Sequence, residues 1–230
     1  MTEQVNAVAG SVIFSEKPAS DNILLEARDV SFRYGSGPWI LKNTNIKIAE
    51  GERVGLIGPS GYGKSTLARI MAGYERPVKG QVLWKGGELP HQGYCPVQMI
   101  YQHPEKAVNP RWKLKKSVTE AWEPDDALLK ELRIKKDLWY GRWPNELSGG
   151  ELQRFCVARV LGPQTEFIIA DEMSTMLDAI TQAQIWNVLL DQVKRRNLGL
   201  LVISHNMALA NRLCTRIVNL EKMNMVEHEV

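Results

Sequence analysis

Apolar residues along this chain gather in short runs that end at glycine, proline or charged residues. Two of these runs, Phe167–Ala170 and Gly199–Ile203, are apolar throughout, which is the pattern of strands buried on both faces of a parallel sheet. A third run, Arg53–Ile57, leads through a glycine-rich stretch into a helix-forming segment, Thr66–Ala72. Buried strands followed by helices predict an α/β fold.

Weaker patterns predict the other elements. Strands are expected at Ile23–Tyr34, Trp39–Ile48, Gly80–Gly87 and Gln98–Tyr101, helices within 114–140 and at Glu151–Leu161, and two short strands between Arg216 and Val230. Pro124 and the aspartates that follow it mark the start of a new helix. Residues 1–21 mix small, polar and acidic residues with few large apolar ones, so we expect a flexible arm there.

The stretch between the third run and its helix carries the strongest chemical signal. Residues 58–65 read G-P-S-G-Y-G-K-S and fit the phosphate-binding pattern G-x-x-x-x-G-K-[ST]. The glycines let backbone N–H groups approach a triphosphate at a helix N-terminus, where an anion is favoured. Lys64 can reach the outer phosphates, and the Ser65 hydroxyl can hold Mg²⁺. The candidate nucleotide-binding residues are Gly58, Pro59, Ser60, Gly61, Tyr62, Gly63, Lys64, Ser65 and Thr66.

Composition limits the class of protein. At 230 residues, 44% hydrophobic and 24% charged, the chain is long enough for one large soluble domain with an inserted lobe, and its net charge of +3 does not by itself indicate nucleic acid. The basic runs 113–116 and 133–136 are interpreted as solvated helix faces. The three cysteines lack metal-ligand spacing, and no apolar run reaches the ~20 residues that span a bilayer. We therefore expect a cytoplasmic protein with reduced thiols, unless a partner holds it at a membrane.

Polar residues at the ends of the apolar runs are candidates for catalysis. Asp171 and Glu172 end one run: Asp171 can join a Mg²⁺ shell and Glu172 can polarise a water, although a solvated acidic turn would read the same way. His205 follows another run and can reach an outermost phosphate, or it is an ordinary loop histidine. Gln102 can order Mg²⁺ or water, or bond within its own turn.

Two further features leave alternatives open. Tyr34 follows a strand and precedes a glycine-rich turn, so its ring could stack on a nucleotide base, with Trp39 as the rival platform. Ser148, Gly149 and Gly150 begin a predicted helix, where exposed N–H groups would form a second anion site or simply a capped helix end.

Taken together, these stretches resemble the ATP-binding subunits of ABC transporters over roughly residues 23–228. The motifs that carry the resemblance are G-P-S-G-Y-G-K-S-T from residue 58, Gln102, L-S-G-G-E-L-Q-R from residue 147, I-I-A-D-E ending at Glu172, L-D at 177–178 and S-H at 204–205. The resemblance implies an ATPase domain over 22–230. Its expected parts are a P-loop NTPase core with a mixed, mostly parallel sheet and flanking helices, an N-terminal antiparallel β subdomain, and a helical subdomain inserted at about 103–162.

The resemblance also implies roles for individual residues, with ATP and Mg²⁺ as cofactors. Glu172, His205 and Gln102 are the expected catalytic residues, and Tyr34 is the expected adenine platform. Mg²⁺ ligands would be Ser65, Gln102 and Asp171. A head-to-tail dimer is implied, in which ATP lies between the phosphate loop of one subunit and Ser148, Gly149 and Gly150 of the other, with Asp178 at the same interface.

The implied function is ATP hydrolysis that powers a membrane importer from the cytoplasmic side of the inner membrane. Residues 107–111 and 177–184 are similar to the peptide and nickel importer group, so peptides, nickel or a metal chelate are the expected cargo. Expected partners are permease subunits, indirectly a substrate-binding protein, and a second ATPase subunit, with an unlike partner favoured over a homodimer. The alternative is a soluble ABC ATPase that acts on nucleic acid or ribosomes. Two features depart from the group: Met173 stands where the family usually has proline, and the helical subdomain is shortened.

Overall fold

The computed structural model describes residues 13–14 and 17–226, and it contains two β-sheets. The larger sheet is parallel throughout its described strands, in the order β1 (Ile13–Phe14), β10 (Arg216–Asn219), β4 (Arg53–Ile57), β9 (Gly199–Ile203), β8 (Phe167–Asp171) and β7 (Val97–Ile100). The smaller sheet is antiparallel, in the order β3 (Leu41–Ala49), β2 (Ile23–Phe32), β5 (Lys79–Trp84) and β6 (Gly87–Glu88). This arrangement confirms the predicted fold class.

The two fully apolar runs form neighbouring central strands, as predicted. Every residue of β8 and β9 is buried. Alternate side chains of β8 point to opposite faces of the sheet, because successive residues of a strand alternate. Ile168 and Ala170 pack on the helical side, whereas Ile169 packs toward the smaller sheet. The parallel sheet is therefore the layer that separates two hydrophobic cores.

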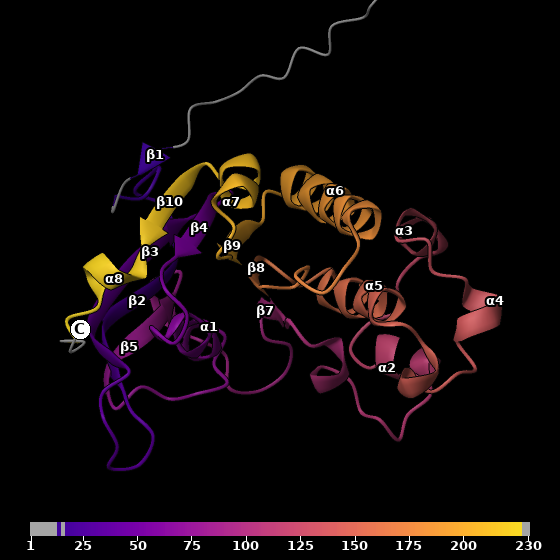
Figure 1. Cartoon of the computed structure of the whole chain (residues 1–230), viewed down its shortest axis with the longest axis horizontal. Coiled ribbons are helices and arrows are strands. Elements are labelled where there is room, and N and C mark those ends of the chain that lie inside the picture. The colour runs from indigo at the N-terminus through magenta and orange to yellow at the C-terminus, as the bar shows by residue number, and fades with distance from the viewer. Residues whose placement is uncertain (1–12, 15–16, 227–230) are drawn as a thin grey trace, which may run out of the picture.

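Helices flank the sheets and gather into a separate group at one end of the molecule. The helical elements are α1 (Lys64–Met71), η1 (Pro104–Lys106), α2 (Leu114–Val118), α3 (Asp126–Glu131), α4 (Lys136–Trp139), η2 (Pro144–Glu146), α5 (Gly149–Val160), α6 (Ala179–Arg196), α7 (Met207–Leu213) and α8 (Leu220–Met223). Figure 1 shows α2 to α5 together at the end opposite the smaller sheet. Asp125 caps α3 by accepting a hydrogen bond from the N–H of Leu128, so the helix start predicted after Pro124 is confirmed. Among the described helices, none has the length and apolar character needed to cross a bilayer.

The C-terminal segment differs from its predicted structure. Two short strands were expected on either side of residues 222–224; the first is β10, but the chain then forms α8, and residues 227–230 of the second lie outside the described residues. Asn219 caps α8 by accepting from the N–H of Glu221, and the Asn224 side chain bonds the backbone of Ile40 and Lys42. Asparagine side chains that bond the backbone compete with strand pairing. In this segment the asparagine bonds form and strand pairing does not continue.

The predicted flexible arm over residues 1–21 needs one correction. Ile13 and Phe14 form β1 and pair with Arg216 and Ile217 of β10, so this part of the arm adds a parallel strand to the larger sheet. The N–H of Ala19 donates to Glu52 Oε1 at 3.1 Å. The arm's residues 1–12 and 15–16 lie outside the described residues.

A buried ion pair joins the two sheets. Arg216 Nε donates to Glu52 Oε1 at 2.6 Å, and the two side chains are 5% and 1% exposed. Arg216 also donates to the carbonyl of Lys47 on β3, and the N–H of Ala49 donates to Glu52 Oε2. The pair is thus surrounded by further hydrogen bonds, which a buried charge pair requires.

The chain passes between the sheet core and the helical group at two places. It leaves after β7 through Gln102, and it returns after α5 through residues 161–165. Arg196, at the end of α6, donates to the carbonyls of Leu161, Gly162 and Thr165 at 2.8, 2.7 and 2.8 Å. The returning crossing is therefore bound firmly to α6.

Candidate nucleotide-binding and hydrolysis site

The phosphate loop lies between β4 and α1, and its backbone conformation requires glycine. Gly63 precedes α1 with φ of 92°, and no side chain caps the helix there. A Cβ at Gly63 would lie 3.0 Å from Ile40 Cγ2 and 3.2 Å from its carbonyl oxygen. The first N–H groups of α1 are left for another acceptor, so the loop fits an anion such as a phosphate.

Lys64 folds into the loop that precedes it. Its Nζ donates to the carbonyl oxygens of Gly58 and Pro59 at 2.8 and 2.7 Å, and the residue is 6% exposed. Burial lowers the pKa of Lys64, and the nearby carboxylates of Glu172 and Asp171 oppose this shift. When a triphosphate binds in the loop, its oxygens would replace the two carbonyls as hydrogen-bond acceptors of the Lys64 ammonium.

Ser65 and Asp171 place two oxygen atoms close together beside the loop. Ser65 Oγ donates to Asp171 Oδ1 at 3.0 Å, and Asp171 is 6% exposed. Burial raises the pKa of Asp171, and the hydrogen bond from Ser65 partly offsets this rise. Mg²⁺ commonly takes one carboxylate, a few other oxygens and the substrate phosphates, so this donor set fits it. Within the described residues, no group of three or more His, Cys, Asp and Glu side chains would hold a metal.

Three predicted catalytic residues meet beyond the ends of neighbouring strands β7, β8 and β9. Gln102 Nε2 donates to Glu172 Oε2 at 3.2 Å, and His205 Nδ1 lies 3.4 Å from Glu172 Oε1. Gln102 Nε2 also donates to Thr175 Oγ1 at 3.2 Å. The carboxyl ends of parallel strands share one edge, which is where such sheets bind ligands. Because Glu172 contacts both other side chains, this carboxylate is the centre of the cluster.

The segment that follows β8 contains contacts that the sequence did not indicate. Ser174 is 4% exposed, and its Oγ accepts hydrogen bonds from Gln182 Nε2 at 2.8 Å and Trp186 Nε1 at 3.0 Å. Thr175 is the second partner of Gln102. The only signal in the sequence is that Gln182 and Trp186 are four residues apart, a spacing that places two side chains on one face if the segment is helical. Met173, of undefined role in the sequence, is 2% exposed in the helical-side core.

The second predicted anion site lies in a different part of the molecule. Ser148 caps α5 by accepting from the N–H of Glu151, and the Glu151 carboxylate accepts from the N–H of Ser148 at 2.8 Å. A Cβ at Gly149 would meet nothing within 4 Å, whereas one at Gly150 would lie 3.2 Å from Thr181 Cγ2. Figure 1 shows α5 among the helical group and α1 beside the smaller sheet. The structure therefore does not bring Ser148, Gly149 and Gly150 together with the phosphate loop of their own chain.

Asp178 begins α6 beside this second site. Its Oδ1 accepts from the N–H groups of Ile180 and Thr181 at 3.0 and 2.9 Å. The hydrogen bond from the N–H of Thr181 is the main reason that the pKa of Asp178 is lowered. Because Thr181 also borders Gly150, the start of α6 and the start of α5 share one surface.

The two candidate adenine platforms differ in their surroundings. Tyr34 is 52% exposed, and its ring meets Phe32 edge-on with 4.9 Å between ring centroids. The guanidinium of Arg33 lies over the ring of Trp39, 4.6 Å from its centroid. A face of Trp39 is thus already occupied, which favours Tyr34 as the platform.

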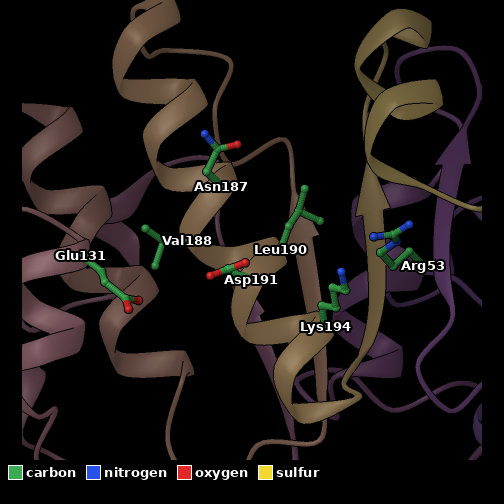
Figure 2. A pocket seen from close by; sticks show the side chains of 7 residues that line it. All are labelled: Arg53, Glu131, Asn187, Val188, Leu190, Asp191 and Lys194. Carbon is green, nitrogen blue, oxygen red and sulfur yellow. The ribbon is translucent and has the colours of Figure 1, made fainter. Parts of the chain in front are cut away.

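A separate hollow runs along α6, away from these residues. Figure 2 shows it lined by Arg53, Glu131, Asn187, Val188, Leu190, Asp191 and Lys194. Arg195 pairs with Glu131 at 3.2 Å and with Asp191 at 3.4 Å, so both acidic groups have a cationic partner. No predicted site residue lines this hollow, and we place no ligand in it.

Comparison with known proteins gives a consistent result. The family model described as ABC transporter matches residues 41–175. The nickel import system ATP-binding protein NikE of Staphylococcus aureus (strain bovine RF122 / ET3-1) is 35% identical over 218 residues, which cover 89% of this chain and 89% of that protein.

Solved structures share the fold. The dimeric structure of MJ0796, a bacterial ABC transporter cassette, matches with a TM-score of 0.71 at 24% identity, over 85% of this chain and 94% of that one. The cbiO1 protein from Clostridium perfringens, part of the ABC transporter complex cbiONQ, matches with a TM-score of 0.69 at 20% identity, over 86% and 85% of the two chains. The resemblance carried by the motifs is confirmed: the chain belongs to the ABC transporter family, whose ATP-binding subunits hydrolyse ATP to power transport.

Proposed function

We propose that this chain powers a membrane importer, and that Glu172 activates the water that hydrolyses ATP. The observation that carries the proposal is the convergence of Gln102 and His205 on the Glu172 carboxylate, at the same sheet edge as the phosphate loop. A carboxylate held in this way can accept a proton from a water aligned with the outermost phosphate.

In this mechanism each group has one task. The phosphate loop and Lys64 hold the triphosphate, and Tyr34 stacks on the adenine. Mg²⁺ would be held by Ser65 and Asp171, with Gln102 as the third expected ligand, and would neutralise charge on the phosphates. Glu172 takes the proton of the attacking water as the bond from the γ-phosphorus to its bridging oxygen breaks, which leaves ADP and inorganic phosphate. His205 donates a hydrogen bond to the γ-phosphate oxygens.

Nickel is the cargo that the comparisons favour, with peptides or a metal chelate as coarser alternatives. The support is the relative NikE, a nickel import system ATP-binding protein that matches this chain over 89% of both lengths. Cargo uptake by the assembled transporter tests this choice: nickel should be transported in an ATP-dependent way. Uptake of a peptide with no uptake of nickel would overturn it.

We further propose that this chain assembles with a second ATPase subunit and with permease subunits, at the cytoplasmic face of the membrane, to form the complete transporter. The exposed start of α5 at Ser148 and Gly149 is the surface that would close over the partner's ATP, and residues 102–111 would contact the permease. An unlike ATPase partner remains favoured, and a substrate-binding protein would act indirectly. Purification of the intact transporter, with a cross-linking cysteine at exposed Lys106, tests both contacts. Two copies of this chain per transporter, or cross-links that never reach a permease, would refute them.

Replacing Glu172 with Gln tests the catalytic proposal. Glu172→Gln keeps the side chain's size and its contacts near Gln102 but removes the base, so ATP should still bind while turnover falls at least ~10²-fold. The control is Glu221→Gln, an exposed change on α8. If Glu172→Gln turns over ATP within a few-fold of the unmodified protein, Glu172 is not the catalytic base.

A further inference from the structure

The segment from Glu172 to Asp178 joins the catalytic strand to α6 through a strained turn. Glu172 has φ of 46°, in the left-handed region that a non-glycine residue holds only when its surroundings fix it. On one side its N–H donates to the carbonyl of Ile203 at 3.1 Å. On the other side its carbonyl accepts from the N–H of Thr175 at 3.2 Å. The turn is thus tied to β9 at its start, and contacts beyond Glu172 hold its other end.

Ser174 is the residue through which α6 holds this turn. Its hydroxyl is buried and accepts from both Gln182 and Trp186, at 2.8 and 3.0 Å. The two donors are one turn apart on α6, so a single helix face presents both of them. The carbonyl of Ser174 accepts from the N–H of Leu177, which continues the turn toward α6.

We propose that Trp186 and Gln182 are positioning residues for ATP hydrolysis, because they hold Ser174 and, through it, the backbone that aims the Glu172 carboxylate. This inference rests on the proposed role of Glu172 as the base. Trp186 touches neither nucleotide nor water in this scheme. Its indole N–H holds one hydroxyl, two residues away from the catalytic carboxylate, and small displacements of a catalytic group have large effects on rate.

The indole N–H can be removed while an aromatic ring is kept in the core. Trp186 is 4% exposed and packs in the helical-side core, so Trp186→Phe keeps an aromatic ring there and deletes the donor. We expect kcat to fall by about tenfold, the scale of one lost hydrogen bond, with the KM for ATP changed less than about twofold. Ser174→Ala removes the shared acceptor and should lower kcat at least as much.

The chain offers a matched control in its helical group. Trp122 Nε1 donates to the carbonyl of Arg159 at 2.9 Å, so Trp122→Phe makes the same chemical change at a site with no bond to residues 172–178. It should leave kcat within about twofold. Thermal unfolding of all variants accompanies the kinetics, so that a loss of folded protein is measured separately from a loss of turnover.

Two combinations decide whether Trp186 acts through Ser174 and Glu172. The double variant Ser174→Ala/Trp186→Phe should turn over no more slowly than Ser174→Ala alone. In a Glu172→Gln background, Trp186→Phe should not lower the residual turnover further. The inference is overturned if the losses in kcat of the two single variants multiply in either combination. It is also overturned if Trp186→Phe alone keeps kcat within about twofold of the parent. Failure of the proposed function is a separate result, because it appears as full turnover in Glu172→Gln alone.

Discussion

Removing the ring of Tyr34 should weaken ATP binding without weakening the fold. The side chain is 52% exposed, and its described ring contact is the edge-on one with Phe32. Truncating it to Ala therefore removes little buried surface, and stability should change by less than about 1 kcal/mol. Stacking of an aromatic side chain on a base is worth about 1–3 kcal/mol. The Kd for ATP should thus rise roughly 5- to 150-fold.

Calorimetric titration with ATP in the Glu172→Gln background measures this change without turnover. Tyr34→Trp should bind ATP nearly as well as the parent, because it keeps a π-face. Trp39→Ala is the matched control, since its ring already lies under the guanidinium of Arg33, 4.6 Å away. It should leave the Kd within about twofold. ADP should lose affinity in Tyr34→Ala by the same factor as ATP, because the adenine is common to both.

The reasoning fails if Tyr34→Ala binds ATP as tightly as the parent. It also fails if Trp39→Ala shows the larger loss, which would move the platform to the rival ring. A loss of affinity in Tyr34→Ala with an equal drop in folding stability would show that Phe32 depends on the contact. The binding change would then not measure stacking.

Two predictions concern the free energy of unfolding, each measured by urea denaturation. Glu52→Ala leaves the buried Arg216 without its carboxylate and should cost roughly 3–5 kcal/mol; a loss below about 1 kcal/mol would contradict the importance of the pair. In acid, the pKa of Glu151 is lowered from 4.5 by the N–H of Ser148, and that of Asp178 from 3.8 by the N–H of Thr181. Since both folded-state pKa values lie below the unfolded-state values, the associated stability is present above pH 4.5 and 3.8 and is lost as pH falls through the folded-state values. Glu151→Gln and Asp178→Asn should each make stability less dependent on pH below about 4.5, and an unchanged acid slope would contradict this sign.

The central part of the fold could be predicted from local pattern. Phe167–Ala170 and Gly199–Ile203 are apolar on both faces because they lie between two cores. The parallel pairing of their strands then places the residues that follow them on one edge. Glu172 and His205 lie close together for this reason, and the sequence alone was enough to expect it.

Other features depend on contacts between residues distant in the sequence. The apolar alternation after Arg216 suits a strand, but Asn224 bonds the backbone of residues 40 and 42, which no local pattern reveals. Ser174 is a small polar residue in a loop, and its two donors lie eight and twelve residues later. Local pattern did not rank Tyr34 above Trp39; the resemblance did, and the position of Arg33 adds a physical reason.

The two crossings between the sheet core and the helical group are held by different kinds of contact. At the returning crossing, three carbonyls between residues 161 and 165 are bound to Arg196 within 2.8 Å, so this joint resists displacement. At the leaving crossing, the side-chain amide of Gln102 bonds only Glu172 and Thr175 among its described hydrogen bonds, both at 3.2 Å. We therefore expect a displacement of the helical group relative to the sheet core to be taken up more at Gln102 than at the crossing held by Arg196. Such a displacement would reach the Glu172 carboxylate, because Gln102 donates to it directly.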